Sequence, residues 1–147
     1  MRLFLKLKKF GYTGNMIVVI DCNIWITLTL NSQIDFIADL SDNGILIASC
    51  TALRNEIKTV LDRPKFSKFI TQSNIEKVIE LHDLVTTMYD PGKIIPVTTD
   101  PKDDYLFALS AKSKADYLVT GDKLLLDVGK YKKTEIITFA NFKELVS

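Results

Sequence analysis

Short runs of apolar, mostly β-branched residues recur along the chain at intervals long enough to hold helices. The first run, at 16–21, reads M-I-V-V-I-D and lacks any alternation of polar and apolar positions. That pattern is typical of a strand buried on both faces of a parallel sheet. Four similar runs follow at 45–49, 93–97, 117–120 and 135–139. Strands that alternate with helices in this way predict an α/β fold.

Apolar residues at helical spacing fill the intervals between these runs. The segment from Ile34 to Leu40 has this spacing, and Gly44 is expected to end its helix. Thr51 and Ser73 are each expected to cap a helix. We therefore expect further helices at 51–62, from Ser73 through Val85, at 103–114, directly after Asp122, and at 141–146.

The composition is that of a single folded domain. The 147 residues, of which 47% are hydrophobic, suffice for one core around one sheet. Cys22 and Cys50 have no CxxC spacing and the chain has one histidine, so a zinc site lacks ligands. We expect the protein to be cytoplasmic, because these cysteines suit a reducing compartment and the apolar run 3–5 is too short for export or a membrane span.

Four acidic residues are placed at the same edge of the predicted sheet. Asp21 ends the first strand, Asp122 follows the fourth, Asp104 begins the helix after the third, and Glu56 lies on the helix after the second. In an open parallel sheet, ligands bind in the crevice beyond the carboxyl ends of the strands. The shared polarity of the strands is therefore expected to bring the four carboxylates together.

Clustered carboxylates raise one another's pKa unless a cation neutralises them. Oxygen ligands without histidine or thiolate favour Mg²⁺ or Mn²⁺ over zinc or copper. Such an ion keeps coordination positions for water and phosphate, so the cluster predicts hydrolysis of a phosphodiester bond. The predicted metal ligands and catalytic residues are Asp21, Glu56, Asp104 and Asp122.

Each of these acids also has a simpler explanation when it is taken alone. Asp between a strand and a helix is a common N-cap, which suits Asp21 and Asp104 equally well. Glu56 is typical of a solvent-exposed helical residue that pairs with Arg54 or Lys58. The prediction of a site therefore depends on the combination of all four.

Asn23, Thr120 and Asp103 are supporting candidates. Asn23 and Thr120 could orient the acids or contact a phosphate, although Asn23 would serve equally well as a helix cap. Consecutive helical residues point about 100° apart, so one of Asp103 and Asp104 is expected to face the site. Asp104 is favoured because it precedes the small Ala108 by one helical turn.

Other polar and aromatic residues are given less specific roles. Arg54, Lys58 and Lys123 are candidates for contact with an RNA backbone. His82 lies within a predicted helix without a nearby serine or cysteine motif, so a structural or surface role is favoured. Trp25 lies in an apolar run and is expected in the core or at a dimer contact.

The formal net charge of +1 is unevenly distributed. Residues 1–15 contain four basic residues and no acid, so the rest of the chain carries three more acidic than basic residues. We expect residues 16–147 to form the folded domain and residues 1–15 to be a basic extension. That extension is either the product of an upstream start codon or an arm that contacts RNA.

Four motifs resemble those of PIN domains, in the same order and spacing from Met16 onward. They are V-V-I-D-C-N at 18–23, R-N-E-I at 54–57, D-P-K-D-D-Y-L-F-A-L-S-A at 100–111 and Y-L-V-T-G-D-K-L-L-L at 117–126. The pattern is most similar to compact bacterial and archaeal PIN domains, the VapC-like ribonucleases of toxin–antitoxin pairs. Lys123 to Leu125 replace a further acid that relatives often carry, and residues 1–15 have no counterpart.

The resemblance implies a three-layer sandwich in which helices cover both faces of a mostly parallel sheet of about five strands. It also implies endoribonuclease activity with Mg²⁺ or Mn²⁺, frequent homodimers, and an antitoxin whose tail blocks the site. The family's four metal-binding acids correspond to Asp21, Glu56, Asp104 and Asp122, and Asn23 matches the polar position after the first acid. Residues 16–147 would then be the nuclease domain.

One other enzyme class, one signalling domain and two related functions compete with this interpretation. An aspartyl-phosphate phosphatase of the haloacid dehalogenase type needs a second acid where Asn23 stands, and a receiver domain needs an acid pair near the first strand. Both are disfavoured. A PIN-fold module that binds RNA or protein without cleavage and a housekeeping RNA-processing nuclease stay as alternatives.

Overall fold

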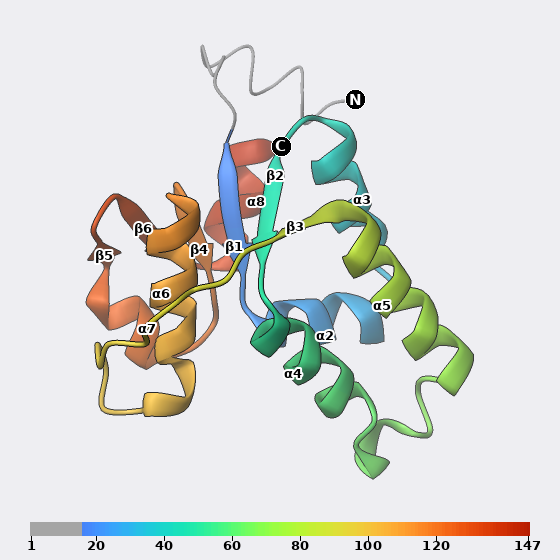
Figure 1. Ribbon diagram of the computed structural model, residues 1–147. Helices are drawn as coiled ribbons and strands as arrows, with labels where there is room; N and C mark the ends of the chain where they lie inside the picture. Colours follow the sequence, from blue (N-terminus) through green and yellow to red (C-terminus); the bar gives the residue numbers. More distant parts are fainter. Residues whose placement is uncertain (1–15) are drawn as a thin grey trace.

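Four of the five apolar runs form strands of a six-stranded sheet in the computed structural model, which describes residues 16–147 (Figure 1). The strand order is β3-β2-β1-β4-β6-β5, and every neighbouring pair is parallel except β5 and β6. The strands are β1 (Ile17–Ile20), β2 (Leu46–Ser49), β3 (Thr86–Met88), β4 (Tyr117–Val119), β5 (Lys130–Tyr131) and β6 (Thr134–Ile137). The predicted mostly parallel sheet is present, with the short antiparallel β5 added at its edge.

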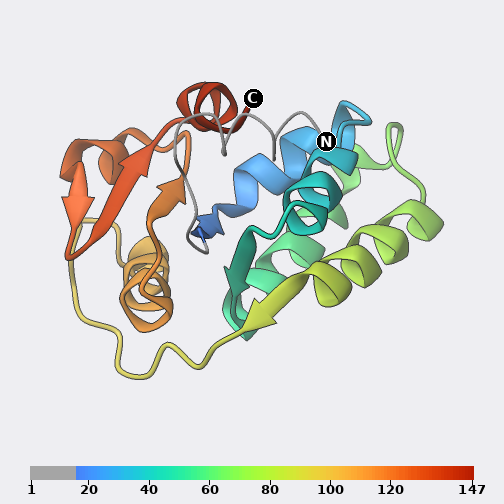
Figure 2. The ribbon, with the colours of Figure 1, turned by 90° about the horizontal axis from the view of Figure 1, so that it is seen from above.

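Helices connect these strands and cover the sheet. They are α2 (Cys22–Leu30), α3 (Asp35–Asp42), α4 (Thr51–Leu61), α5 (Gln72–Val85), α6 (Asp104–Ser113), α7 (Lys123–Val128) and α8 (Phe139–Val146), with short 3₁₀ turns at Pro64–Phe66 and Pro101–Asp103. Figure 2 shows α6 on one face of the sheet and α8 on the other. The predicted α/β three-layer arrangement is confirmed.

The core lies on both faces of the central strands. Val18, Val19 and Ile20 of β1 are all buried, because β2 and β4 flank the strand and helices cover it. Aromatic rings fill the helix layers: Phe36 of α3 lies 5.3 Å from Phe139 of α8, centroid to centroid, and nearly perpendicular to it. This packing fixes the carboxyl ends of β1, β2 and β4 side by side.

The predicted third strand at 93–97 is wrong. Residues 93–97 have no regular structure, and the third strand is β3, which begins directly after α5. The apolar Ile94 and Ile95 are exposed on a segment that passes in front of α6 (Figure 1). The edge strand β3 instead contains Thr86 and Thr87, whose polar side chains suit a sheet edge. Because these residues are polar, no apolar run in the sequence indicated this strand.

Other differences concern the helices. The apolar run after Asp21 is the helix α2, which is not among the expected helices, although Asp21 and Asn23 are candidate helix caps. Trp25 within it is fully buried in the core. The caps of two helices also differ from expectation. Cys50 rather than Thr51 is the N-cap of α4, and Thr71 rather than Ser73 caps α5 by accepting a hydrogen bond from the Asn74 N–H at 3.1 Å.

The predicted basic extension at 1–15 lies outside the described residues. Within 16–147, no helix combines the length and the apolar character needed to cross a membrane.

Candidate active site

Asp21 lies where β1 ends and α2 begins, and it is 5% exposed. Its backbone N–H donates to the Val119 carbonyl at 2.9 Å, which continues the ladder between β1 and β4. This register sets Asp21 beside Thr120, whose hydroxyl donates to Asp21 Oδ2 at 2.7 Å. The first acid is therefore held at the carboxyl edge of the sheet by a neighbouring strand.

Thr120 also connects Asp21 to Asp122. Its Oγ1 accepts a hydrogen bond from the Asp122 N–H at 3.0 Å, so one buried hydroxyl contacts both acidic positions. Asp122 Oδ1 in turn accepts from the Leu124 N–H at 2.9 Å and caps α7. Asp122 is thus a helix cap and a neighbour of Asp21 at the same time.

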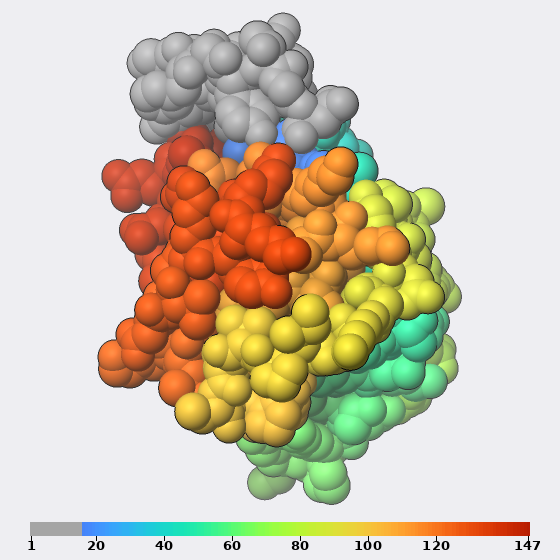
Figure 3. Space-filling view, turned by 60° about the vertical axis from the view of Figure 1, so that its left-hand side comes forward, coloured from blue at the N-terminus to red at the C-terminus, as the bar shows by residue number. Residues whose placement is uncertain are grey.

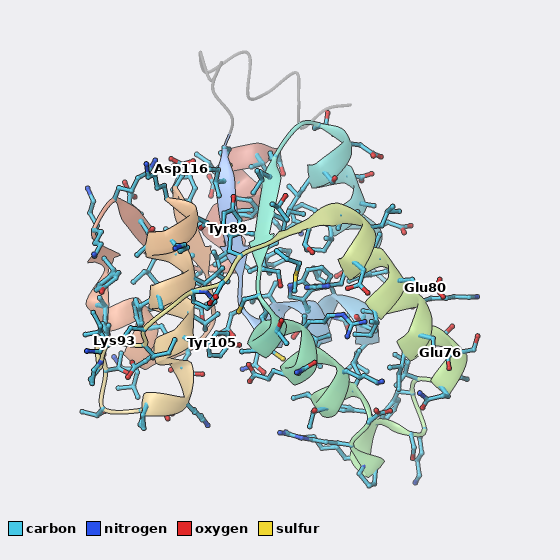
Figure 4. The ribbon with its side chains drawn as sticks, viewed as in Figure 1. Glu76, Glu80, Tyr89, Lys93, Tyr105 and Asp116 are labelled. Atoms are coloured by element: carbon cyan, nitrogen blue, oxygen red, sulfur yellow. The ribbon has the colours of Figure 1, made fainter. Side chains whose placement is uncertain are left out.

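Glu56 reaches this edge from α4, and its partner is Tyr105 on α6. The Tyr105 hydroxyl donates to Glu56 Oε1 at 2.5 Å. Burial, followed by the hydrogen bond and charge of Glu56, raises the pKa of Tyr105, so this phenol stays a donor. Figure 4 shows Tyr105 between α6 and α4. The sequence reasoning did not include Tyr105, whose one signal was its place directly after two acids.

The structure places Asp103, rather than Asp104, against the other acids. Asp103 ends the 3₁₀ turn that precedes α6, and, beyond the effect of burial, it is near enough to Asp122 and Asp21 for their charges to raise its pKa. Asp104 Oδ1 instead accepts from the Thr98 N–H at 3.1 Å and from the Thr98 hydroxyl at 3.3 Å. The preference for Asp104 assumed regular helical geometry through both residues, whereas the 3₁₀ turn changes the direction of each side chain.

The four neighbouring acids repel one another. The pKa of Asp21 is raised by burial and by the charges of Glu56 and Asp122, against the lowering effect of Thr120. Burial, the hydrogen bond with Asp122 and the charges of Asp21 and Asp122 raise the pKa of Asp103 to about 7. Asp21, Glu56, Asp103 and Asp122 therefore form a single electrostatic group, which we call the carboxylate edge.

The donors of the carboxylate edge are all oxygens, which suit Mg²⁺ or Mn²⁺. Within residues 16–147, no three Asp, Glu, His or Cys side chains already converge on one point as metal ligands do. Asp21 accepts from Thr120, Glu56 from Tyr105 and Asp122 from the Leu124 N–H, so three of the four acids already have partners. The group fits such a cation in donor type and charge. To bind it, these carboxylates would have to rotate toward one point.

The remaining sequence candidates lie around this edge with other partners. Asn23 is exposed in the first turn of α2, and Lys58 is exposed on α4. The Arg54 guanidinium binds both oxygens of Asp83, at 2.7 and 2.9 Å, and therefore pairs with Asp83 and not with Glu56. Lys123 pairs with Asp127 at 3.3 Å.

His82 belongs to a separate buried network on α5 and β2. Its Nε2 lies 2.7 Å from Ser49 Oγ, and its Nδ1 lies 2.9 Å from Asp83 Oδ1. The ring also packs against Trp25, with centroids 5.4 Å apart. Ser49 and His82 have no exposed surface, which agrees with the structural role expected for this histidine.

The fold and the acids at the carboxyl ends of its strands define an α/β protein with an acidic candidate site. The family model described as "PIN domain" matches residues 17–124. The chain therefore belongs to the PIN-domain family, and the resemblance found in its motifs is confirmed.

One solved structure supports the same fold. A chain in the crystal structure of VapBC2 from Rickettsia felis, bound to a DNA fragment from its promoter, is similar with a TM-score of 0.55. The two chains are 13% identical, and the match covers 84% of this chain and 98% of that one. No curated protein matches the sequence.

Proposed function

We propose that this protein is a metal-dependent endoribonuclease that hydrolyses RNA phosphodiester bonds at the carboxylate edge. The observation that carries the proposal is that the buried Thr120 hydroxyl joins Asp21 and Asp122, while burial and the charges of neighbouring acids raise the pKa values of Asp21 and Asp103. Such an arrangement is unfavourable without a cation and is typical of functional sites. Membership of the PIN-domain family supports it.

In this proposal the four acids hold Mg²⁺ or Mn²⁺, which supplies charge neutralisation at the phosphate and activation of water. Thr120 fixes Asp21 through its hydroxyl, and Tyr105 fixes Glu56 in the same way. These hydrogen bonds keep both carboxylates at the edge of the sheet, as partners of metal ligands commonly do. Asp104 acts indirectly, because its bond to Thr98 ties the incoming segment to the start of α6.

The test is cleavage of single-stranded and structured RNA by the purified protein in Mg²⁺ or Mn²⁺. EDTA is expected to abolish cleavage, and Asp21→Asn to lower its rate by about 100-fold or more, since loss of even an outer partner of a metal ligand costs about 10- to 100-fold. Asp39→Asn is the matched control, because Asp39 is an exposed acid on α3. Its rate should equal that of the wild type.

Two outcomes would contradict this mechanism. Cleavage that survives EDTA or the Asp21→Asn substitution would exclude the metal–carboxylate chemistry. RNA binding in Mn²⁺ without any cleavage would favour the alternative of a PIN-fold binding module. Melting temperatures of both variants, measured alongside, separate a lost site from a lost fold.

We also propose that the protein is the toxin of a toxin–antitoxin pair in the cytoplasm, with an antitoxin as its partner and a homodimer as its assembly. Likeness to a chain of the VapBC2 structure supports this proposal. Induced expression should arrest growth, Asp21→Asn should remove the arrest, and co-expression of a small protein encoded next to it should relieve it. If cells that express the protein grow normally although the purified protein cleaves RNA, the alternative of a housekeeping RNA-processing nuclease would be favoured.

A further inference from the structure

A cavity of about 260 Å³ lies beside α6, and none of the acids of the carboxylate edge lines it. Its walls come from three segments that are separate in sequence: α6, the segment 91–95 after β3, and the turn between β5 and β6. Figure 3 shows these three segments next to one another on one face of the molecule. We call this hollow the lysine cavity, for the reason given next.

Each of the three segments contributes one lysine to the cavity: Lys93, Lys112 and Lys132. Among the described residues that line it, none is Asp or Glu. The ion pairs within 16–147 involve other lysines, namely Lys102, Lys123 and Lys133. Three exposed lysines that line one hollow without a carboxylate make it electropositive, which favours an anion there.

The rest of the lining adds an apolar floor and an aromatic ring. Ala108 and Ala111 present small side chains on α6, which leaves the space open. The Tyr131 ring packs edge-on against Phe107 with centroids 5.2 Å apart, so its orientation is fixed. Cations beside an aromatic ring suit a nucleotide, because a base can stack on the ring while the phosphate meets the lysines.

The hairpin between β5 and β6 sets the position of Lys132 beside the aromatic ring. The φ of Lys132 is 53°, in the left-handed region that glycine and asparagine adopt most readily. Lys132 is the first residue of the two-residue turn between β5 and β6, and such hairpin turns favour positive φ. Lys132 Nζ lies 5.9 Å from the centroid of the Tyr131 ring. The turn thus holds a cation at the aromatic wall.

The lysine cavity is close to the carboxylate edge along α6. A helix rises 1.5 Å per residue, so Ala108 lies about 6 Å and Lys112 about 12 Å along the axis from Asp104. Asp103, at the start of the same helix, belongs to the carboxylate edge. One RNA strand can therefore reach both places within a few nucleotides. Figure 4 shows Lys93 on the segment that passes over this helix.

We propose that the lysine cavity binds a nucleotide of the RNA strand that flanks the cleaved bond, with its phosphate at the three lysines and its base against Tyr131. This inference rests on the proposed ribonuclease function, because it assigns the cavity to that enzyme's substrate. It differs from the RNA contacts expected of Lys58 and Lys123, which do not line the cavity.

The test measures the binding of a fluorescent single-stranded RNA to the full chain in EDTA, which separates binding from cleavage. Lys93→Gln/Lys112→Gln should weaken binding by about tenfold and reduce the slope of log affinity against log salt by roughly 0.7 for each phosphate that the two lysines neutralise. Lys77→Gln/Lys143→Gln is the matched control, because both lysines are exposed and lie outside the cavity. It should leave affinity and slope unchanged.

A second measurement locates the ligand. Inorganic phosphate and uridine monophosphate are titrated separately while the aromatic NMR signals of Tyr131 are followed. Both should displace these signals in the wild type and not in Lys93→Gln/Lys112→Gln, and the mononucleotide should have the larger effect because of stacking. Equal RNA affinity of the cavity variant and the wild type, or an equal loss in the control variant, would overturn the proposal.

These results are independent of whether the protein cleaves RNA. Binding that depends on the cavity in a protein without cleavage would refute the proposed enzyme and uphold the binding site. The opposite result is cleavage by a protein whose RNA affinity and Tyr131 signal do not change when Lys93 and Lys112 are replaced. That result would uphold the proposed enzyme and refute the binding site.

Discussion

Two groups of polar side chains lie near the carboxyl ends of neighbouring strands, and they differ in how their charges are satisfied. The carboxylate edge gathers four acids, and both Asp21 and Asp103 have raised pKa values. The His82 network joins Ser49, His82, Asp83 and Arg54 by hydrogen bonds between partners of complementary character.

The Arg54 and His82 contacts lower the pKa of Asp83 to about 2, opposite to the shift of Asp103. Both acids have hydrogen-bonding neighbours, so the sign of the neighbouring charge makes the difference. A carboxylate with a cationic partner stabilises the fold, whereas acids whose neighbours are acids lower its stability. The comparison indicates that the His82 network maintains the structure and that the carboxylate edge is retained for chemistry.

The sharpest test of this comparison is within the carboxylate edge, where Asp103 and Asp104 are adjacent in sequence. In Mn²⁺, Asp103→Asn is expected to lower RNA cleavage by about 100-fold, since it removes a carboxylate that contacts Asp122. Asp104→Asn should keep nearly full activity, because its amide oxygen can still accept from Thr98. Steady-state cleavage rates of the two folded variants decide between them, and the reverse order of effects would restore Asp104 as the ligand.

This pair also shows how far sequence reasoning reaches. Asp21 and Asp122 could be placed because Asp21 directly follows β1 and Asp122 lies three residues after the end of β4, and the pairing of these two strands brings them together. The direction of the Asp103 side chain could not be predicted, because it depends on the turn that Pro101 begins just before α6. This short 3₁₀ turn, Pro101–Asp103, changes which of two consecutive acids faces the site.

The fold was predictable where burial leaves a pattern and not elsewhere. The central strands are buried on both faces and read as apolar runs, so β1, β2 and β4 were found. The edge strand β3 has no such run. The exposed residues Ile94 and Ile95 lie in an apolar run outside the sheet, and that run was therefore wrongly predicted to be a strand. The helix α2 was missed because its apolar residues surround it instead of forming one stripe.

The next largest effect is expected in the His82 network and should appear in stability instead of activity. His82→Leu leaves the fully buried Ser49 hydroxyl without its partner, at a cost of about 2–3 kcal/mol in the free energy of unfolding. His82→Gln should recover part of that loss, since an amide can still bond to Ser49. Urea unfolding gives both values. Cleavage by the folded fraction should be unchanged, and a selective loss of activity would place His82 in the mechanism.

The smallest expected effect is the pH dependence of the free energy of unfolding in EDTA. It tests the carboxylate edge and the His82 network together. Burial lowers the pKa of His82 below its ordinary value of 6.5, although Asp83 opposes the shift. As pH falls below about 6.5, the unfolded chain therefore binds a proton that the folded chain does not, and stability falls. For Asp103, with a pKa of about 7 in the folded protein against 3.8, the folded chain binds the extra proton below pH 7. Its contribution to stability rises as pH falls from about 7 toward 3.8.

The two contributions oppose each other between pH 7 and 5.5, each limited to about 1.4 kcal/mol per pH unit. The wild type should therefore vary little in free energy of unfolding over this range. His82→Gln, which retains Asp103, should become more stable as pH falls, and Asp103→Asn, which retains His82, should become less stable. Urea unfolding of the three proteins at pH 7.0, 6.25 and 5.5 measures these slopes. If the two variants had slopes of the same sign, the opposite electrostatic character of the two regions would be refuted, because removal of either group exposes the other's response.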